Sequence, residues 1–270
     1  MKSTKLGFTL VEVSLFLAIT ALLFFGVTLG VRGSISQQRY NDSVQSFAEF
    51  LRSEYSEVAN VEHTGTGTSE QAIYGKLLSF GETYDLAGNN IGLVDNKVFS
   101  YTVIGDVGDG CANEPSGGTV CPDGVLGILQ NLNVRITTSD NKLAGISQEY
   151  SPKWGAEIQN TKVYNGGYEL FEGSVLIVRH PETGMIHTFF NEGKTEVNFA
   201  IKGGFEIPSL PLVDADGNSS LWKAQEIDFC VNPLGRAETN MRRDVRIAKN
   251  ARNASGVEII NQDGADNRCK

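Results

Sequence analysis

One carboxylate interrupts an otherwise uncharged apolar segment near the start of this chain. Glu12 is the only charged residue among the 24 residues from Phe8 to Val31, which follow a leader containing Lys2 and Lys5. A membrane-spanning helix needs about 20 apolar residues, so this segment is long enough to cross a bilayer. An ionised carboxylate at that depth costs roughly 2.5–3.5 kcal/mol, by comparison with aspartate on insertion scales. Glu12 therefore needs a partner.

A second group of residues could bind phosphate. Six basic side chains fall within 17 positions: Arg236, Arg242, Arg243, Arg246, Lys249 and Arg252. Phosphate contacts from arginine and lysine drive non-specific DNA binding. However, Glu238 and Asp244 interrupt the cluster, and no aromatic residue is interleaved to stack on bases. A solvated loop or a subunit contact is the favoured interpretation, with DNA contact by the arginines as the alternative.

A third group resembles the start of a calcium loop. Asp214, Asp216 and Asn218 offer oxygen ligands at alternate positions around Gly217. The closing bidentate glutamate and a third acidic residue are missing, so a solvated turn is favoured over a structural calcium site. No other cofactor is expected.

Catalytic motifs are not found. The chain has three histidines and contains no G-x-S-x-G, P-loop or H-E-x-x-H pattern. We therefore expect no enzymatic activity and no small-molecule substrate. The formal net charge of −9 argues against general attraction to nucleic acid or anionic lipid, although a local basic patch remains compatible with it.

A long helix must position Glu12. Beyond Arg32, apolar residues recur at spacings of three and four: Tyr40, Val44, Phe47, Leu51, Tyr55 and Val58. This pattern predicts an amphipathic helix that continues to about Ala59 and covers a sheet with its apolar stripe. The two halves together make one helix of about 50 residues, roughly 75–80 Å long.

Short strands are predicted after the helix. They are Ala72–Phe80, Phe99–Ile104, Val175–Val178, Met185–Phe190, Glu226–Val231 and Val257–Ile260, and the third and fourth flank a plausible hairpin turn at 181–184. Gly- and Asn-rich connections are expected between them, including Gly108–Gly124 and Ser139–Gly167. The expected fold is α+β, with one long N-terminal helix packed on an antiparallel sheet.

The segment around Gly7 fits two ordinary explanations poorly. A secretory signal peptide has a small-residue cleavage site after its apolar run, whereas Gly7 precedes it. A simple membrane anchor explains the length of the run but not Gly7, Phe8 and Glu12 together. Lys5, Gly7, Phe8, Thr9, Leu10, Val11 and Glu12 closely resemble the G-F-T-L-x-E signature of type IV pilins and type II secretion pseudopilins.

This resemblance has specific implications for processing and assembly. It implies that prepilin peptidase cuts between Gly7 and Phe8, that Phe8 becomes N-methylated, and that Glu12 neutralises the free amine of a neighbouring pilin subunit in a helical filament. It divides the chain into a leader (1–7), a transmembrane half-helix (8–32), an amphipathic half-helix (33–60) and a β-rich globular domain (61–270). The chain would cross the cytoplasmic membrane once, with the globular domain outside, before it joins an extracellular filament.

The C-terminal half resembles the H-type minor pseudopilins and related minor pilins. The similar residues are Glu226–Cys230, Pro233–Arg236, Val245–Ile247 and Val257–Ile260, together with Tyr74-Gly75 in an early strand. Some minor pilins of this group bind DNA through a basic loop that starts with Gly-Arg, as Gly235-Arg236 does here, and some major pseudopilins hold calcium in a C-terminal loop.

The four cysteines show no metal-binding spacing and are even in number. On a chain whose globular part lies outside the cell, they favour disulfides. We expect Cys111–Cys121 and Cys230–Cys269, one of three possible connectivities.

The expected function is that of a pilin-like structural subunit, with a minor subunit favoured because the 263 residues left after removing the first 7 of 270 are many for a major pilin. One alternative is a pilus-tip recognition subunit that binds DNA for uptake or a host surface. Others are a major pilin and a monomeric membrane-tethered domain.

Overall fold

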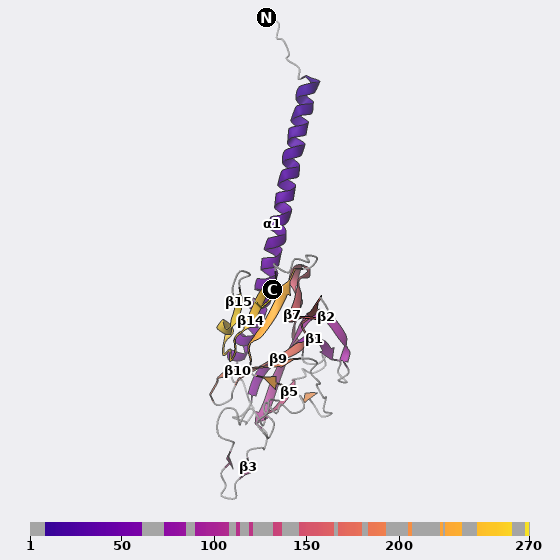
Figure 1. Ribbon diagram of the computed structural model, residues 1–270. Coiled ribbons are helices and arrows are strands. Elements are labelled where there is room, and N and C mark those ends of the chain that lie inside the picture. The colour runs from indigo at the N-terminus through magenta and orange to yellow at the C-terminus, as the bar shows by residue number, and fades with distance from the viewer. Residues whose placement is uncertain are drawn as a thin grey trace. The chain divides into compact units, whose positions relative to one another are not determined.

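The computed structural model describes residues 9–60, 73–84, 90–107, 112–113, 119–120, 132–136, 146–164, 167–179, 183–192, 205–206, 222–223, 225–233, 242–260 and 268–269. In this part of the chain, a helix α1 (Leu10–Ala59) is followed by antiparallel strands (Figure 1). The predicted α+β class is confirmed. The chain divides into two compact units between Asp42 and Ser43, and each is described by itself.

The first unit contains the apolar part of α1. Its 18 residues from Leu10 to Val27 are long and apolar enough to cross a membrane, and none is buried. Large side chains remain open along this stretch, with Leu10 at 87% and Phe16 at 67% exposure. This half is consistent with a single membrane span or with a signal segment.

The second unit contains the amphipathic part of α1. The predicted stripe is confirmed from Val44 onward, because Val44, Phe47, Leu51, Tyr55 and Val58 are all 0–1% exposed, whereas Tyr40 is half-buried. Polar residues on the other face, including Glu49 and Ser56, are exposed. The helix therefore buries one face against the strands, as its spacing requires. In this respect the arrangement is pilin-like.

Two large sheets form the body of the second unit. The strands are β1 (Ile73–Tyr84), β2 (Asn90–Val107), β3 (Ala112–Asn113), β4 (Thr119–Val120), β5 (Leu132–Ile136), β6 (Ile146–Tyr150), β7 (Glu157–Tyr164), β8 (Gly167–Leu170), β9 (Gly173–Arg179), β10 (Ile186–Glu192), β11 (Phe205–Glu206), β12 (Trp222–Lys223), β13 (Ile227–Asn232), β14 (Arg243–Ile247) and β15 (Val257–Ile260). The first sheet has the order β11-β5-β2-β1-β9-β10-β12, with β6 also paired to β2. The second has the order β15-β14-β13-β7-β8, and β3 pairs with β4 separately.

Most predicted strands are found, including the hairpin, in which β9 pairs with β10 and Arg179 lies opposite Ile186. Two expectations are wrong. The connection expected at Ser139–Gly167 contains β6 and all of β7, and two large sheets replace the single sheet. β7 carries few apolar residues, and its pairing with β13 comes from a partner far along the chain. A local pattern does not carry that signal.

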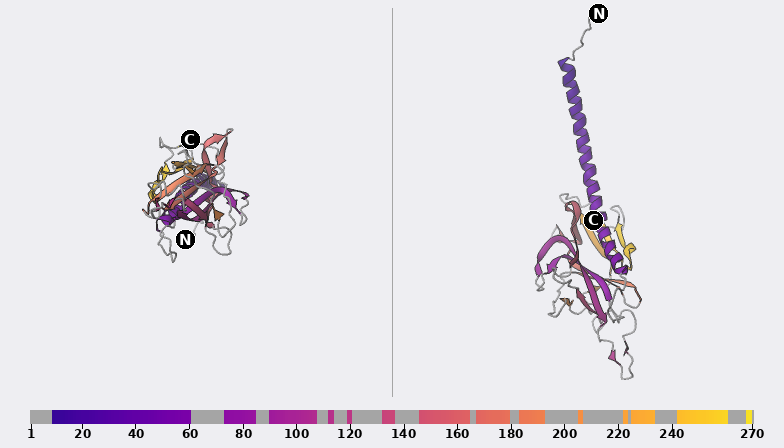
Figure 2. Two further views of the ribbon diagram at one scale, coloured as in Figure 1. Left: turned by 90° about the horizontal axis from the view of Figure 1, so that it is seen from below. Right: turned by 180° about the vertical axis from the view of Figure 1, so that it is seen from behind.

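The two sheets meet at the aromatic residues of α1. Phe47 packs edge-on against Phe80 of β1 and Phe229 of β13, with ring centroids 6.4 and 5.5 Å apart. Phe50 stacks on Tyr150 of β6 at 4.7 Å. Figures 1 and 2 show the end of α1 beside β14 and β15, where the guanidinium of Arg52 donates to the carbonyl of Val257 at 2.9 Å. The helix thus holds both sheets together.

Glycine in the Tyr74-Gly75 pair has a packing reason. A Cβ atom at Gly75 would lie 2.4 Å from the backbone oxygen of Ile177 in the neighbouring strand β9. Any side chain there would push the two strands apart, so the central pairing of the first sheet depends on this glycine.

Candidate functional site

Glu12 caps the helix that carries it. Thr9 precedes the first residue of α1, and its backbone N–H donates to Glu12 Oε2 at 2.9 Å. The Thr9 hydroxyl also donates to Glu12 Oε2 at 2.9 Å and accepts from the Glu12 backbone N–H at 3.3 Å. These reciprocal bonds form a capping box, which satisfies donors that the first helical turn would otherwise leave unpaired. The Glu12 carboxylate is thereby oriented toward the start of the helix.

That orientation suits an interaction with a cation at the chain terminus or on another molecule. Glu12 is exposed, as are the apolar side chains that follow it in α1. A continuous apolar surface of this kind is unstable in water and needs lipid or other helices around it. Gly7 and Phe8 lie outside the described residues, so cleavage, methylation and charge pairing at Phe8 stay predictions.

A second carboxylate of α1, Glu54, is buried against the first sheet. It is 0% exposed and accepts a hydrogen bond from the Ser100 hydroxyl at 2.7 Å. Burial raises the pKa of Glu54, while the Ser100 hydroxyl and the charge of Lys76 act in the opposite direction. The Lys76 ammonium lies 2.9 Å from Glu57 and 3.2 Å from the Thr102 hydroxyl. The contacts of Glu54 with Ser100 and of Lys76 with Glu57 and Thr102 together hold α1 on β1 and β2.

A pair of buried hydroxyl groups joins α1 to strand β10 of the first sheet. The Tyr55 and Thr188 oxygens are 2.7 Å apart, and Thr188 donates to the Ala251 carbonyl at 3.1 Å. Since the Thr188 hydrogen is committed to Ala251, Tyr55 is the donor in the first bond. Burial raises the pKa of Tyr55, so this phenol stays protonated at neutral pH.

The described arginines of the basic cluster lie on or beside β14. Arg242 is 1% exposed, and Arg243 is half-buried. The Arg246 guanidinium lies 2.5 Å from Asp228 and 3.1 Å from Asp244. Phosphate contact by Arg246 would require it to leave these carboxylates. DNA contact by this set stays a prediction, and Arg236 lies outside the described residues.

The Cys230–Cys269 disulfide is present, with its Cα atoms 5.4 Å apart. The prediction for this pair is confirmed. Cys111 and Cys121 lie outside the described residues, as do Asp214, Asp216 and Asn218 of the calcium hypothesis. Within the described ranges, no three His, Cys, Asp or Glu side chains are grouped so that they could hold a metal ion.

Two features escaped the sequence reasoning. The capping role of Thr9 had a readable signal, because Thr-x-x-Glu before an apolar run is typical of a capping box. The ion pair between Asp228 and Arg246 had no such sequence signal. It depends on the register between β13 and β14, where these two residues lie opposite each other.

In comparisons with protein-family models, with curated proteins and with solved structures, none matched this chain. The family resemblance therefore rests on the N-terminal residues and on the architecture.

Proposed function

We propose that this chain is a pilin-like structural subunit, a minor pilin or pseudopilin of a type IV pilus or a related secretion or competence filament. The observation that carries the proposal is the division of one helix into two kinds of surface. Residues 10–27 are apolar and exposed around a single carboxylate, and the apolar stripe between Val44 and Val58 is buried against antiparallel sheets. A filament core of bundled apolar helices would cover the first surface.

Glu12 has a specific role in this proposal. In lipid or in a bundle of apolar helices, its charge requires a cation. The methylated amine of Phe8 on a neighbouring subunit would be that cation after prepilin peptidase removes residues 1–7. Each buried charge would then satisfy the other. The chain would cross the cytoplasmic membrane once before assembly and would lie in an extracellular filament afterwards.

Two arginines of the basic cluster are unfavourably placed for the recognition alternative, while Arg252 is exposed. Arg242 is buried, and Arg246 is held by carboxylates on β13 and β14. We therefore propose assembly, and not DNA or host-surface binding, as the main role. Catalysis is not part of the proposal.

The deciding experiment combines mass spectrometry of sheared surface filaments with the change Glu12→Gln. Glutamine can still accept the hydrogen bond from Thr9, so this change removes the charge while it keeps the helix cap. We expect the wild-type chain in trace amount, beginning at N-methylated Phe8, and at least a tenfold loss of Glu12→Gln from the filament fraction, about the effect of 1.4 kcal/mol.

Glu49→Gln is the matched control, because Glu49 is an exposed carboxylate of the same helix that bonds Gln45. It should leave incorporation unchanged. A dominant species that starts at Phe8 would instead identify a major pilin. A chain that keeps its leader and stays out of filaments, with Glu12→Gln silent, would contradict the proposal and support a monomeric tethered domain.

A further inference from the structure

One face of the second sheet is polar and yet buried. Asp228 lies opposite Arg246 in the β13–β14 ladder, and Cys230 lies opposite Asp244, so all four side chains share a face. The alternate residue Phe229 points to the other face, where it packs on the aromatic core. A polar face of an antiparallel sheet usually contacts water. Here Asp228 is only 8% exposed and Asp244 is 0% exposed.

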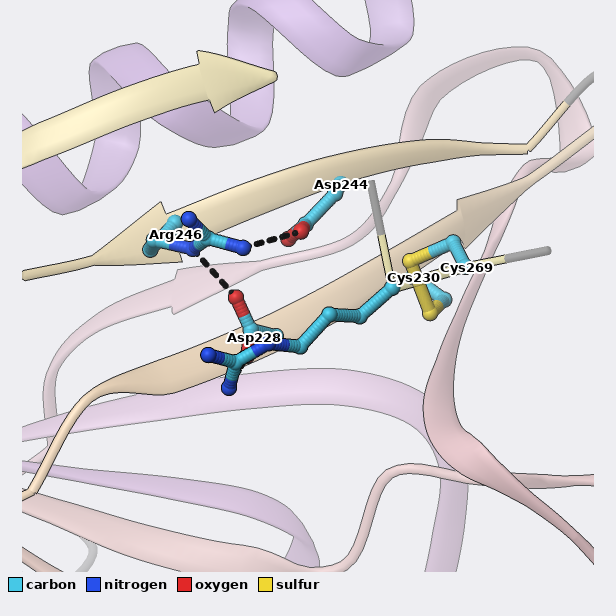
Figure 3. The surroundings of a disulfide bond; sticks show 6 residues. Asp228, Cys230, Asp244, Arg246 and Cys269 are labelled. Atoms are coloured by element: carbon cyan, nitrogen blue, oxygen red, sulfur yellow. Dashed lines mark hydrogen bonds and ion pairs between the residues drawn. A yellow bond between two sulfur atoms is a disulfide. The ribbon is translucent and has the colours of Figure 1, made fainter. Parts of the chain in front are cut away.

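The C-terminal residues Arg268 and Cys269 cover part of this face. Cys269 is 1% exposed and is joined to Cys230 of β13 (Figure 3). The guanidinium of Arg268 lies 2.7 Å from Asp228 and 2.7 Å from Glu226. Arg268 and Cys269 therefore make one disulfide and two ion pairs with β13 and with Glu226, which precedes it.

Arg268 brings a second guanidinium group to the carboxylates on this face. Glu226, Asp228 and Asp244 surround Arg246, at 3.7, 2.5 and 3.1 Å (Figure 3 shows the two shorter contacts). Without Arg268, Glu226 and Asp228 would lose one of the two guanidinium groups that they contact, and breaking such a partly buried contact is costly. The other charged side chains near this face are Arg242, which precedes β14 and is buried, Glu258 of β15 and Glu157 of β7.

The pKa of Asp244 depends on these neighbouring charges. Burial, followed by the charge of Asp228, raises its pKa to about 7, while the charge of Arg246 and the backbone N–H of Arg268 lower it. The tether that keeps Arg268 in place therefore also favours ionisation of Asp244.

We propose that Arg268 and Cys269 form a redox-sensitive clasp, in which the ion pairs of Arg268 with Asp228 and Glu226 hold Cys269 against Cys230 and so make their disulfide harder to reduce. Linkage makes the coupling reciprocal: a contact that brings the sulfurs together favours the bond, and the bond favours the contact. Reduction by glutathione oxidises two glutathione molecules to their disulfide and delivers two electrons and two protons to Cys230 and Cys269. The clasp would then depend on Arg268 alone.

The first test measures the redox equilibrium of the full chain in detergent micelles. The chain is equilibrated with glutathione and glutathione disulfide mixtures at pH 7.5, and alkylated Cys230 and Cys269 peptides are quantified by mass spectrometry. We expect Arg268→Ala to raise the equilibrium constant for reduction of the Cys230–Cys269 disulfide by glutathione about threefold to tenfold. A change of this size is typical for loss of a partly buried ion pair. Arg268→Lys should fall between it and the wild type.

Lys97→Ala is the control, because it removes an ion pair of 2.5 Å to Glu149 that belongs to the other sheet. It should leave the equilibrium unchanged. Equal equilibria for wild type, Arg268→Ala and Lys97→Ala would overturn the clasp, and so would equal shifts in both variants.

The second test reads the coupling in the other direction. A carboxyl group whose pKa is higher in the folded than in the unfolded protein binds an extra proton on folding, so its contribution to stability is lost as pH rises. For Asp244 this loss falls between its ordinary pKa of 3.8 and about 7. In the double variant Cys230→Ser, Cys269→Ser, the upper limit should move to higher pH, because Arg268 is no longer tethered. Thermal unfolding from pH 4 to 9 would show this, and an unchanged upper limit would contradict the proposal.

Discussion

The two halves of α1 carry carboxylates with opposite surroundings. Glu12 is exposed within an apolar half, and its hydrogen bonds come from Thr9 in the same helical turn. Glu54 is buried in the amphipathic half and bonds to Ser100 of the first sheet. One carboxylate is thus bonded locally and open to other molecules, while the other is enclosed by the domain.

The difference teaches what each half can be used for. The apolar side chains between Val44 and Val58 pack on the sheets, so the apolar face of the second half is part of the protein's own core. Side chains from Leu10 to Val27 contact nothing that covers them within the described chain. Among the described residues of α1, the first half therefore offers an uncovered apolar surface for lipid or for other subunits, and this supports assembly through that half.

The largest effect should come from truncating the core of the second half. Phe47→Ala removes a ring that contacts both sheets through Phe80 and Phe229. We expect a loss of about 3–5 kcal/mol in the free energy of unfolding, the usual range for a buried phenylalanine. Urea unfolding of the full chain in micelles, followed by tyrosine and tryptophan fluorescence, measures it.

Leu17→Ala is the control in the first half, where Leu17 is 61% exposed. Its effect on unfolding of the globular domain should stay within about 0.5 kcal/mol. Comparable losses from both changes would break the contrast between the two halves.

A smaller effect, with a defined pH dependence, is expected for Glu54→Gln. The pKa of Glu54 is raised from its ordinary value of 4.5, so the folded protein keeps a proton that the unfolded chain has lost. The wild-type chain therefore loses stability as pH rises above 4.5. Glutamine does not titrate, and the stability of Glu54→Gln relative to wild type should therefore increase from pH 4.5 to pH 8.

Glu49→Gln, at an exposed carboxylate of the same helix, is the control. Thermal unfolding midpoints over this pH range provide the measurement. A flat difference between Glu54→Gln and wild type would mean that Glu54 is not desolvated in the folded protein.

The smallest effect should come from Thr9→Val, which removes the capping hydroxyl at the start of α1. Loss of an N-cap typically costs about 1 kcal/mol, and here the cost falls on the first helical turn alone. We expect faster amide hydrogen exchange at Glu12 and Val13 and unchanged unfolding of the globular domain. If exchange at these amides is unchanged, the capping box contributes nothing in the micelle.

Prediction from sequence succeeded where neighbouring residues determine the structure. The bounds of α1, the stripe from Val44 to Val58 and the β9–β10 hairpin all follow from periodicity and turn residues. Four cysteines allow three connectivities, and the Cys230–Cys269 pair of the predicted one is present in the structure. The Thr9–Glu12 capping box could also have been found in this way, because its partners are three residues apart.

Prediction failed where the partner is distant. β6 contains Ser-Gln-Glu and β7 is largely polar, so neither has the apolar alternation of a half-buried strand. β6 pairs with β2 and β7 pairs with β13, at separations of about 45 to 75 residues along the chain, although β7 also pairs with its neighbour β8. Polar strands of this kind gain their place from backbone pairing, which depends little on side-chain type.

The residue order alone determined a long helix with an apolar and an amphipathic half, because a 3.6-residue period and a run of apolar side chains act on neighbours. The tertiary structure decided that Asp228, Asp244 and Arg246 form a buried charged cluster beneath Arg268. In sequence, Arg246 belongs to a basic cluster that could be in solvent. Strand register and the disulfide bring distant opposite charges together, and only that proximity determines which of them leave water.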